Sequence, residues 1–84
     1  MLKIYSTTWC GYCARLKKQL EREGIQFTEV NIEEDETAAK FVESVNGGNQ
    51  TVPTVVMPSG VTMTNPSLSQ VKAALSEVTT SPST

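Results

Sequence analysis

The stretch "TTWCGYC", residues 7–13, contains both cysteines of the 84-residue chain, Cys10 and Cys13, in a Cys-x-x-Cys spacing. A structural zinc site needs four ligands, and two cysteines without any histidine cannot complete one within a single chain. A disulfide across so short a loop would hold no distant segments together. The missing histidine also excludes a Ser-His or Cys-His nucleophile. Redox chemistry is therefore favoured, and a purely structural pair or an iron–sulfur cluster shared by two chains remain as alternatives.

The segments outward from this stretch alternate between strand and helix patterns. Residues 2–6 predict a strand with Leu2 and Ile4 on one side, and residues 11–23 predict a helix with Cys13, Leu16 and Leu20 on one face. Further on, the pattern predicts a strand over 25–32, a helix over 36–46 capped by Asp35, a hairpin of strands 54–57 and 61–64, and a last helix to about residue 78, capped by Asn65 with Pro66 at its first position. The expected buried residues of the later helices are Ala38, Phe41, Val42 and Val45, and then Leu68, Val71, Leu75 and Val78.

This order, β-α-β-α-β-β-α, predicts an α/β fold with a mixed four-stranded sheet flanked by three helices. The first β-α-β should be a right-handed parallel unit, and the hairpin should add an antiparallel edge. A Cys-x-x-Cys beside a βαβ unit is typical of the thioredoxin-like architecture. We expect one domain over residues 1–78 and a disordered tail over 79–84, which lacks apolar residues.

We expect a cytoplasmic protein that acts as a monomer. The net charge is −2 with charges of both signs interspersed, which predicts neither a nucleic-acid partner nor a membrane surface. The N-terminus has no signal-peptide pattern, and no segment approaches the ~20 apolar residues of a membrane span. We interpret the acidic run at residues 33–36 as the solvated start of a helix.

The two cysteines should have different roles. Cys10 falls where a strand ends and a helix begins, so the helix dipole and unpaired amides favour a thiolate there, with an exposed sulfur. Cys13 shares the face of Leu16 and Leu20 and is turned inward, where a thiol keeps its proton. Cys10 would then attack and Cys13 would resolve a mixed disulfide, while Gly11 lets a substrate pass close to Cys10.

A second motif is Thr51-Val52-Pro53. One interpretation is a proline that begins a strand. The other is a cis turn beside Cys10 that exposes the backbone of Val52 for pairing with an extended substrate.

The motifs CGYC after the first strand and TVP before the third, with Gly60 ahead of a capped last helix, resemble the glutaredoxin family over residues 1–78. The stretches "TTWCGYC", "SVNGGNQTVPTV" and "TNPS" are more narrowly similar to the mycoredoxins, the mycothiol-dependent members from actinobacteria. The resemblance implies a thiol–disulfide oxidoreductase that removes mycothiol from proteins.

The resemblance also implies roles for individual residues. Cys10 would be the nucleophile, Cys13 the second cysteine, and Cys10–Cys13 the redox-active disulfide. Val52–Pro53 would be cis. The other residues expected at the thiol site are Thr51 and Val52 through their backbone groups, Tyr12 beside Cys10, and Thr64 and Asn65 at the pocket border. Trp9 is expected either to flank the site as a shield or docking surface, or to pack in the core or rim.

The cofactor and partners follow from the same resemblance. No cofactor would be tightly bound, and mycothiol would serve as co-substrate. The partners would be S-mycothiolated proteins and, indirectly, an NADPH-dependent mycothione reductase. Thr7 stands where many glutaredoxins carry a basic residue for a glutathione carboxylate, which favours a neutral, hydroxyl-rich thiol, although Arg15, Lys17 or Lys40 could supply charge. The alternatives are a redoxin reduced directly by a thioredoxin reductase and an iron–sulfur carrier.

Overall fold

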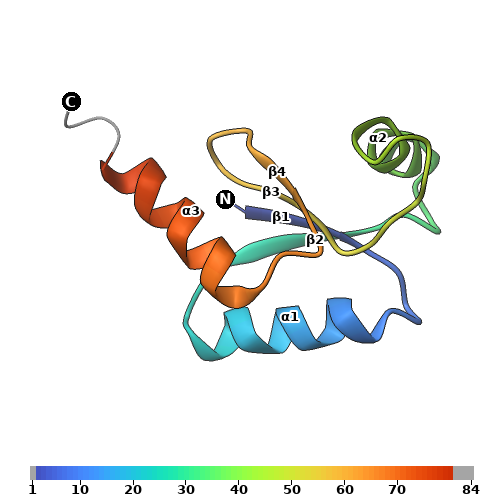
Figure 1. Ribbon diagram of the computed structural model, residues 1–84. Coiled ribbons are helices and arrows are strands. Elements are labelled where there is room, and N and C mark those ends of the chain that lie inside the picture. The colour runs from blue at the N-terminus through green and yellow to red at the C-terminus, as the bar shows by residue number, and fades with distance from the viewer. Residues whose placement is uncertain (1, 81–84) are drawn as a thin grey trace.

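The fold was derived from a computed structural model that describes residues 2–80, with side chains to residue 75. The elements follow the predicted order: β1 (Leu2–Ser6), α1 (Gly11–Arg22), β2 (Phe27–Asn31), α2 (Glu36–Val45), β3 (Thr54–Val56), β4 (Thr62–Thr64) and α3 (Leu68–Thr80). Most bounds lie within one or two residues of the sequence prediction. The thioredoxin-like fold class is therefore confirmed (Figure 1).

The four strands form one mixed sheet in the order β2-β1-β3-β4. Strand β1 is central: it pairs in parallel with β2, Leu2 opposite Phe27, and antiparallel with β3, Ile4 opposite Val55. Strand β4 adds the predicted antiparallel edge, with Met63 opposite Val55. The parallel β1-α1-β2 unit places the Cys-x-x-Cys stretch at the carboxyl end of β1, at the middle of the sheet.

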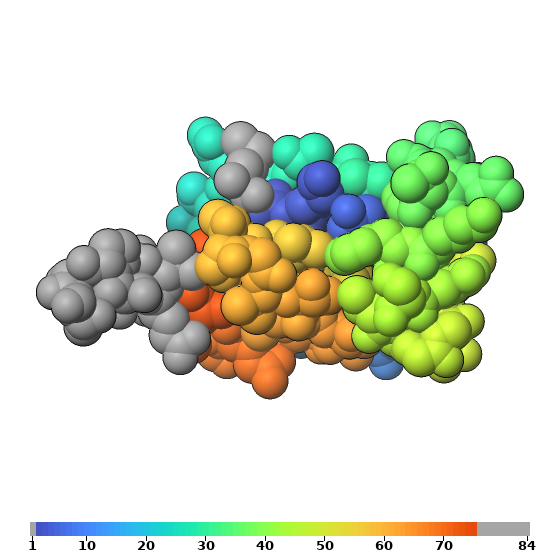
Figure 2. Space-filling model, turned by 90° about the horizontal axis from the view of Figure 1, so that it is seen from above, coloured from blue at the N-terminus to red at the C-terminus, as the bar shows by residue number. Residues whose placement is uncertain are grey.

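Two hydrophobic clusters cover the two faces of the sheet. Because successive side chains of a strand point to opposite faces, Ile4 packs toward α1 and α3 whereas Tyr5 packs toward α2. The first cluster contains Leu2, Ile4, Leu16, Leu20, Val55, Met57 and Val71, and the second contains Tyr5, Ile32, Ala38, Ala39 and Val42. Helices α1 and α3 thus lie on one face of the sheet (Figure 1). Helix α2 covers one end of the other face, which Figure 2 shows from above.

Helix α2 begins as the sequence predicts, but fewer of its residues are buried than the sequence predicts. Asp35 is the N-cap, and its carboxylate accepts the Ala38 amide at 3.1 Å. Ala38 and Val42 are buried as expected. The prediction was wrong for Val45, the last residue of the helix, which is 39% exposed.

The start of α3 also differs from the prediction. Asn65 does not cap the helix; its φ is 46°, and its amide donates to the Pro53 carbonyl at 2.7 Å. The helix begins at Leu68, and Ser67 serves as cap: its hydroxyl accepts the Gln70 amide at 3.2 Å while the Gln70 side chain accepts the Ser67 amide at 2.8 Å. This reciprocal pair is a capping box.

The end of α3 lies at Thr80, two residues beyond the predicted end. Val71 is fully buried, and Leu68 and Leu75 pack against its cluster. The side chain of Val78 and residues 81–84 of the expected tail lie outside the described residues. Over the part of the chain described, none of the helices combines the length and apolar character needed to cross a membrane.

Candidate active site

Cys10 is the N-cap of α1. Its backbone is extended (φ −81°, ψ 109°), and its Sγ accepts the Cys13 amide at 3.1 Å. The thiol also donates to the Val52 carbonyl, 3.8 Å from the sulfur. The helix position is as predicted, but the exposed sulfur is not: Cys10 is only 7% exposed, because the loop that contains Val52 packs over it.

Cys13 faces the interior, as the sequence indicates, and is 1% exposed. Burial, followed by the hydrogen bond to Cys10, raises the pKa of the Cys13 thiol from 9.0 to about 12. The Thr7 backbone amide and the charge of Lys17 act in the opposite direction but do not cancel the effect. Both cysteines are free thiols. At neutral pH the Cys13 sulfur therefore keeps its proton.

The TVP segment lies directly against Cys10. The Val52–Pro53 bond is cis, the conformation that the family resemblance implied. The Thr51 carbonyl accepts the Thr54 hydroxyl at 2.7 Å, and the Pro53 carbonyl accepts the Asn65 amide at 2.7 Å. These bonds fix both sides of the turn and leave the Val52 carbonyl directed at the sulfur of Cys10.

Asn46, at the C-terminus of α2, supports this segment and was missed by the sequence analysis. Its Nδ2 donates to the Val42 carbonyl at 2.8 Å and to the Thr54 hydroxyl at 3.1 Å, and its Oδ1 accepts the Thr64 hydroxyl at 2.6 Å. The predicted site residue Thr64 thus contacts Asn46. An asparagine after a helix is ordinary, so the local sequence gave no sign of this role.

Glu33 is a second residue that the sequence analysis missed. Its carboxylate accepts hydrogen bonds from the Thr8 amide, the Thr8 hydroxyl and the Trp9 indole N–H, and these bonds hold its pKa below the usual range. The interpretation of the acidic run as a helix start is confirmed for Asp35, the N-cap, and Glu36, in the first turn. It was wrong for Glu33, whose carboxylate binds Thr8 and Trp9 instead. Trp9 is 71% exposed, so its core interpretation is excluded and it lies at the rim of the site.

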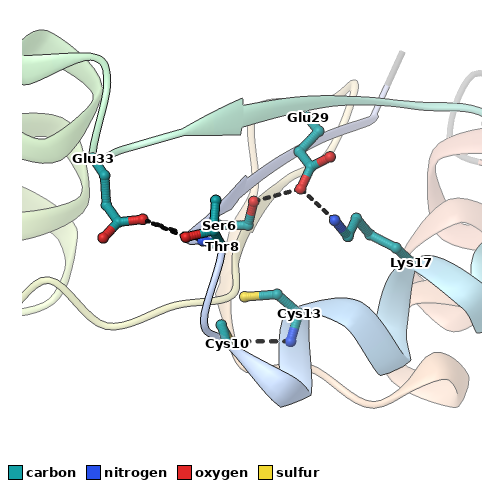
Figure 3. A network of polar contacts seen from close by, with 7 residues as sticks. All are labelled: Ser6, Thr8, Cys10, Cys13, Lys17, Glu29 and Glu33. Atoms are coloured by element: carbon teal, nitrogen blue, oxygen red, sulfur yellow. Dashed lines mark hydrogen bonds and ion pairs between the residues drawn. The ribbon is translucent and has the colours of Figure 1, made fainter.

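A polar network lies beside the cysteines on the β2 side of the sheet. Lys17 of α1 reaches Glu29 of β2, and the same carboxylate oxygen accepts the Ser6 hydroxyl at 2.7 Å (Figure 3). The Lys17 and Ser6 hydrogen bonds lower the pKa of Glu29. These residues line a cavity of about 480 Å³ together with Cys10 and Thr7. The Thr7 hydroxyl is buried and has no hydrogen-bond partner among the described residues.

A second cavity, of about 340 Å³, lies between α1 and the loop before α3. Its wall includes Tyr12, which is 67% exposed, and hydrogen-bonding side chains such as Arg15, Gln19, Asn65 and Gln70. Cys10 itself lines the first cavity and not this one, but Tyr12 is two residues from Cys10 and the Asn65 amide is bonded to the Pro53 carbonyl. The structure therefore brings together Cys10, Cys13, Val52 and Pro53, with Trp9 and Tyr12 on the rim.

No group of three or more histidine, cysteine, aspartate or glutamate side chains arranged to bind a metal occurs within the described range. The chain has two cysteines in total. An iron–sulfur centre with four thiolate ligands would therefore need sulfurs from a second chain.

Comparison with known proteins gives a consistent result. The sequence profile described as glutaredoxin matches residues 2–60. A protein of Mycobacterium tuberculosis that is provisionally named a glutaredoxin is 56% identical over 77 residues, which cover 92% of each chain. Mycoredoxin 1 of Corynebacterium glutamicum is 42% identical over 72 residues, 86% of this chain and 89% of that protein. The crystal structure of a glutaredoxin from Archaeoglobus fulgidus superposes with a TM-score of 0.72 at 25% identity, covering 88% and 84% of the two chains.

Proposed function

The chain belongs to the glutaredoxin family of thiol–disulfide oxidoreductases, and on this premise we propose that it reduces mixed disulfides between proteins and mycothiol. The observation that carries the proposal is the environment of Cys10. Its sulfur accepts a hydrogen bond from the Cys13 amide, and the Val52 backbone lies beside it. The sulfur lies at the start of α1, and the start of a helix favours a negative charge. A sulfur held in this way is suited to attack a disulfide.

The first step is attack of the Cys10 thiolate on the mycothiol sulfur of the mixed disulfide. The protein–mycothiol S–S bond breaks, the protein thiolate leaves and takes up a proton, and a Cys10–mycothiol disulfide forms. A second mycothiol thiolate then attacks the mycothiol sulfur of this disulfide. Cys10 leaves as thiolate and the disulfide of two mycothiols is released, to be reduced elsewhere by an NADPH-dependent mycothione reductase.

Cys13 is a poor candidate for the second step. Burial is the largest cause of its raised pKa and persists when Cys10 is in a disulfide, so the Cys13 thiol keeps its proton at neutral pH and is a weak nucleophile. A free small thiol competes well with it. We therefore propose a monothiol reaction, in which Cys13 forms the Cys10–Cys13 disulfide only when mycothiol is scarce.

The binding of mycothiol is proposed to use the TVP segment and the cavity between α1 and α3. The cysteine part of mycothiol would pair with the backbone of Thr51 and Val52, and its sugar and inositol would face the hydrogen-bonding side chains of Tyr12 and Asn65. The 42% identity to mycoredoxin 1 supports mycothiol as the thiol. The reaction requires a reducing compartment, and we therefore propose that the protein acts in the cytoplasm. We propose that it acts there as a monomer.

The test is to purify Cys10→Ser and Cys13→Ser and to measure removal of mycothiol from a mycothiolated protein. We expect Cys10→Ser to be inactive and Cys13→Ser to keep most of the activity, because the second step uses free mycothiol. Glutathione in place of mycothiol serves as the control thiol and should support much slower turnover. Loss of activity in both variants would contradict the monothiol reaction.

Two results would overturn the proposal as a whole. Turnover with a thioredoxin reductase and NADPH in the absence of any small thiol would identify a redoxin that is reduced directly by that reductase. A coloured dimer after purification without oxygen would identify an iron–sulfur carrier.

A further inference from the structure

We propose that Glu33 is a positioning residue that presents Trp9 to the polypeptide part of a mixed-disulfide substrate. The inference rests on the proposed function, because it concerns the substrate of the same cysteine. Glu33 does not contact the sulfur of Cys10. It acts through Thr8 and Trp9, the two residues that immediately precede the nucleophile.

The geometry is unusual for an exposed carboxylate, because both of its oxygens bind one short loop. Oε1 accepts the Thr8 amide at 3.2 Å and the Thr8 hydroxyl at 3.1 Å, and Oε2 accepts the Trp9 indole N–H at 3.1 Å. Figure 3 shows Glu33 extending from the segment after β2 toward Thr8, above the start of α1. Three donors from two consecutive residues are thus fixed across about 25 positions of sequence.

The hydrogen bonds of Glu33 matter most for the orientation of Trp9. Trp9 is the only tryptophan of the chain, and it is 71% exposed although its N–H is bonded. An exposed tryptophan held in one orientation loses little conformational entropy when a partner packs on it, and tryptophan is enriched among the residues that dominate binding energy. The Glu33 bond supplies that orientation in advance.

The partner is identified by the position of the cysteine. Cys10 is only 7% exposed, so a disulfide carried by a polypeptide reaches it only when that polypeptide lies against the rim, whereas a small disulfide can enter alone. Trp9 adjoins Cys10 in sequence and forms part of that rim. The indole therefore meets the residues next to the modified cysteine of a polypeptide substrate, and a small disulfide that lacks such residues does not contact it.

The test compares two disulfides in the Cys13→Ser background, where only Cys10 reacts. The polypeptide probe is a mycothiolated peptide, and the small probe is bis(2-hydroxyethyl) disulfide. Glu33→Gln keeps one acceptor oxygen, but its NH₂ cannot accept from Thr8 or Trp9. We expect the rate constant with the peptide to fall about tenfold and that with the small disulfide to change by less than about twofold.

The matched control is Glu36→Gln. It removes an equal charge from the same acidic run, and none of the described residues hydrogen-bonds to the Glu36 side chain. Both rate constants should stay at the level of the background protein. An equal fall in the peptide rate in this variant would mean that net charge, and not the bonds of Glu33, sets the effect, and would overturn the proposal.

Trp9→Phe tests whether Glu33 acts through Trp9. It keeps an aromatic ring but lacks the N–H, so the peptide rate should fall, and Glu33→Gln should add little in the double variant. In protein with Trp9 intact, Glu33→Gln should lower the anisotropy of tryptophan fluorescence. Equal slowing of both disulfides, unchanged anisotropy, or additive losses would refute the inference. If the parent protein fails to react with mycothiolated peptide at all, the proposed function fails instead.

Discussion

The two cysteines, three residues apart, have different surroundings at the start of α1. Cys10 precedes the first turn, where its sulfur accepts an unpaired amide. Cys13 lies within that turn, on the face that continues with Leu16 and Leu20 into the hydrophobic cluster. Positions three apart are neighbours on one side of a helix, so the two sulfurs lie close together. They differ because Cys10 precedes the first turn, whereas Cys13 lies deeper, with an exposed fraction of 1%.

The raised pKa of Cys13 predicts how stability depends on pH. In the unfolded chain this thiol ionises near pH 9, whereas in the folded protein it keeps its proton to about pH 12. Between these values the folded state binds more protons, so the free energy of unfolding falls as pH rises, by at most about 1.4 kcal/mol per pH unit from this group. Below pH 9 the contribution is fully present. Urea unfolding of the reduced protein from pH 8 upward measures the slope.

The control for this prediction is Cys13→Ala, which removes the titrating group and keeps a small apolar side chain. The two proteins differ only at this residue, so the difference between the two slopes measures the Cys13 thiol together with its coupling to Cys10. We expect the variant to lose less stability between pH 9 and 11. Parallel curves would show that the Cys13 thiol ionises in the folded state as readily as in the unfolded state.

At the scale of secondary-structure elements, caps and periodicity predicted two helix starts and misplaced the third. Asp35 was predicted as a cap because it precedes a segment with helical hydrophobic periodicity, and its carboxylate caps α2 as expected. Ahead of α3 the sequence offers both Asn65-Pro66 and the Ser67–Gln70 capping box. A long-range bond decides between them, because the Asn65 amide is held by the Pro53 carbonyl. Local sequence contains no information about that partner.

Gly11 gives a prediction for helix α1, of which it is the first residue. A Cβ there would meet no other atom within 4 Å, so the fold itself does not require glycine. Proline suits the first position of a helix, and the extended backbone of Cys10 suits the residue before a proline. Gly11→Pro should therefore raise the free energy of unfolding by about 0.4–1 kcal/mol. Denaturant unfolding under reducing conditions measures the change.

Gly11→Ala is the matched control, since it also restricts the unfolded chain but keeps the amide hydrogen. It should stabilise as well, because alanine is a better helix former than glycine. Destabilisation by both variants would show that an incoming side chain meets a group that the open space does not reveal. Destabilisation by proline alone would show that the Gly11 amide has a necessary partner.

At the scale of the whole molecule, the order of elements and the position of both cysteines were predictable, whereas the contacts between distant segments were not. Hydrophobic periods of 2 and 3.6 and turn residues act locally and can be read from the chain. Glu33 contacts Thr8 and Trp9 across about 25 residues, and Asn46 contacts Thr64 across 18. Such partners depend on how strands and helices pack, so a local pattern does not predict them.

The hydrogen bonds of Asn46 give a prediction about what holds the TVP segment in place. The Asn46 side chain joins the end of α2 to Thr54 of β3 and Thr64 of β4, and the Thr54 hydroxyl in turn holds the Thr51 carbonyl. Asn46→Ala removes the bonds to the Val42 carbonyl and to the Thr54 and Thr64 hydroxyls, which should cost about 1–2 kcal/mol of unfolding free energy. The bond between Thr54 and Thr51 remains. The variant should also raise the KM for a mycothiolated peptide, because Thr51 is less firmly held.

The matched variant for Asn46→Ala is Asn49→Ala, three residues further along. Asn49 is exposed, and its side chain makes one bond, at 3.3 Å, to the Asn46 carbonyl. Its removal should change the free energy of unfolding by less than about 0.5 kcal/mol and leave the KM unchanged. If Asn46→Ala lowers stability without changing the KM, the Asn46 network holds α2 to the sheet but does not position the TVP segment. If the KM rises in Asn46→Ala alone, the bonds from α2 through Thr54 reach the substrate site beside Cys10.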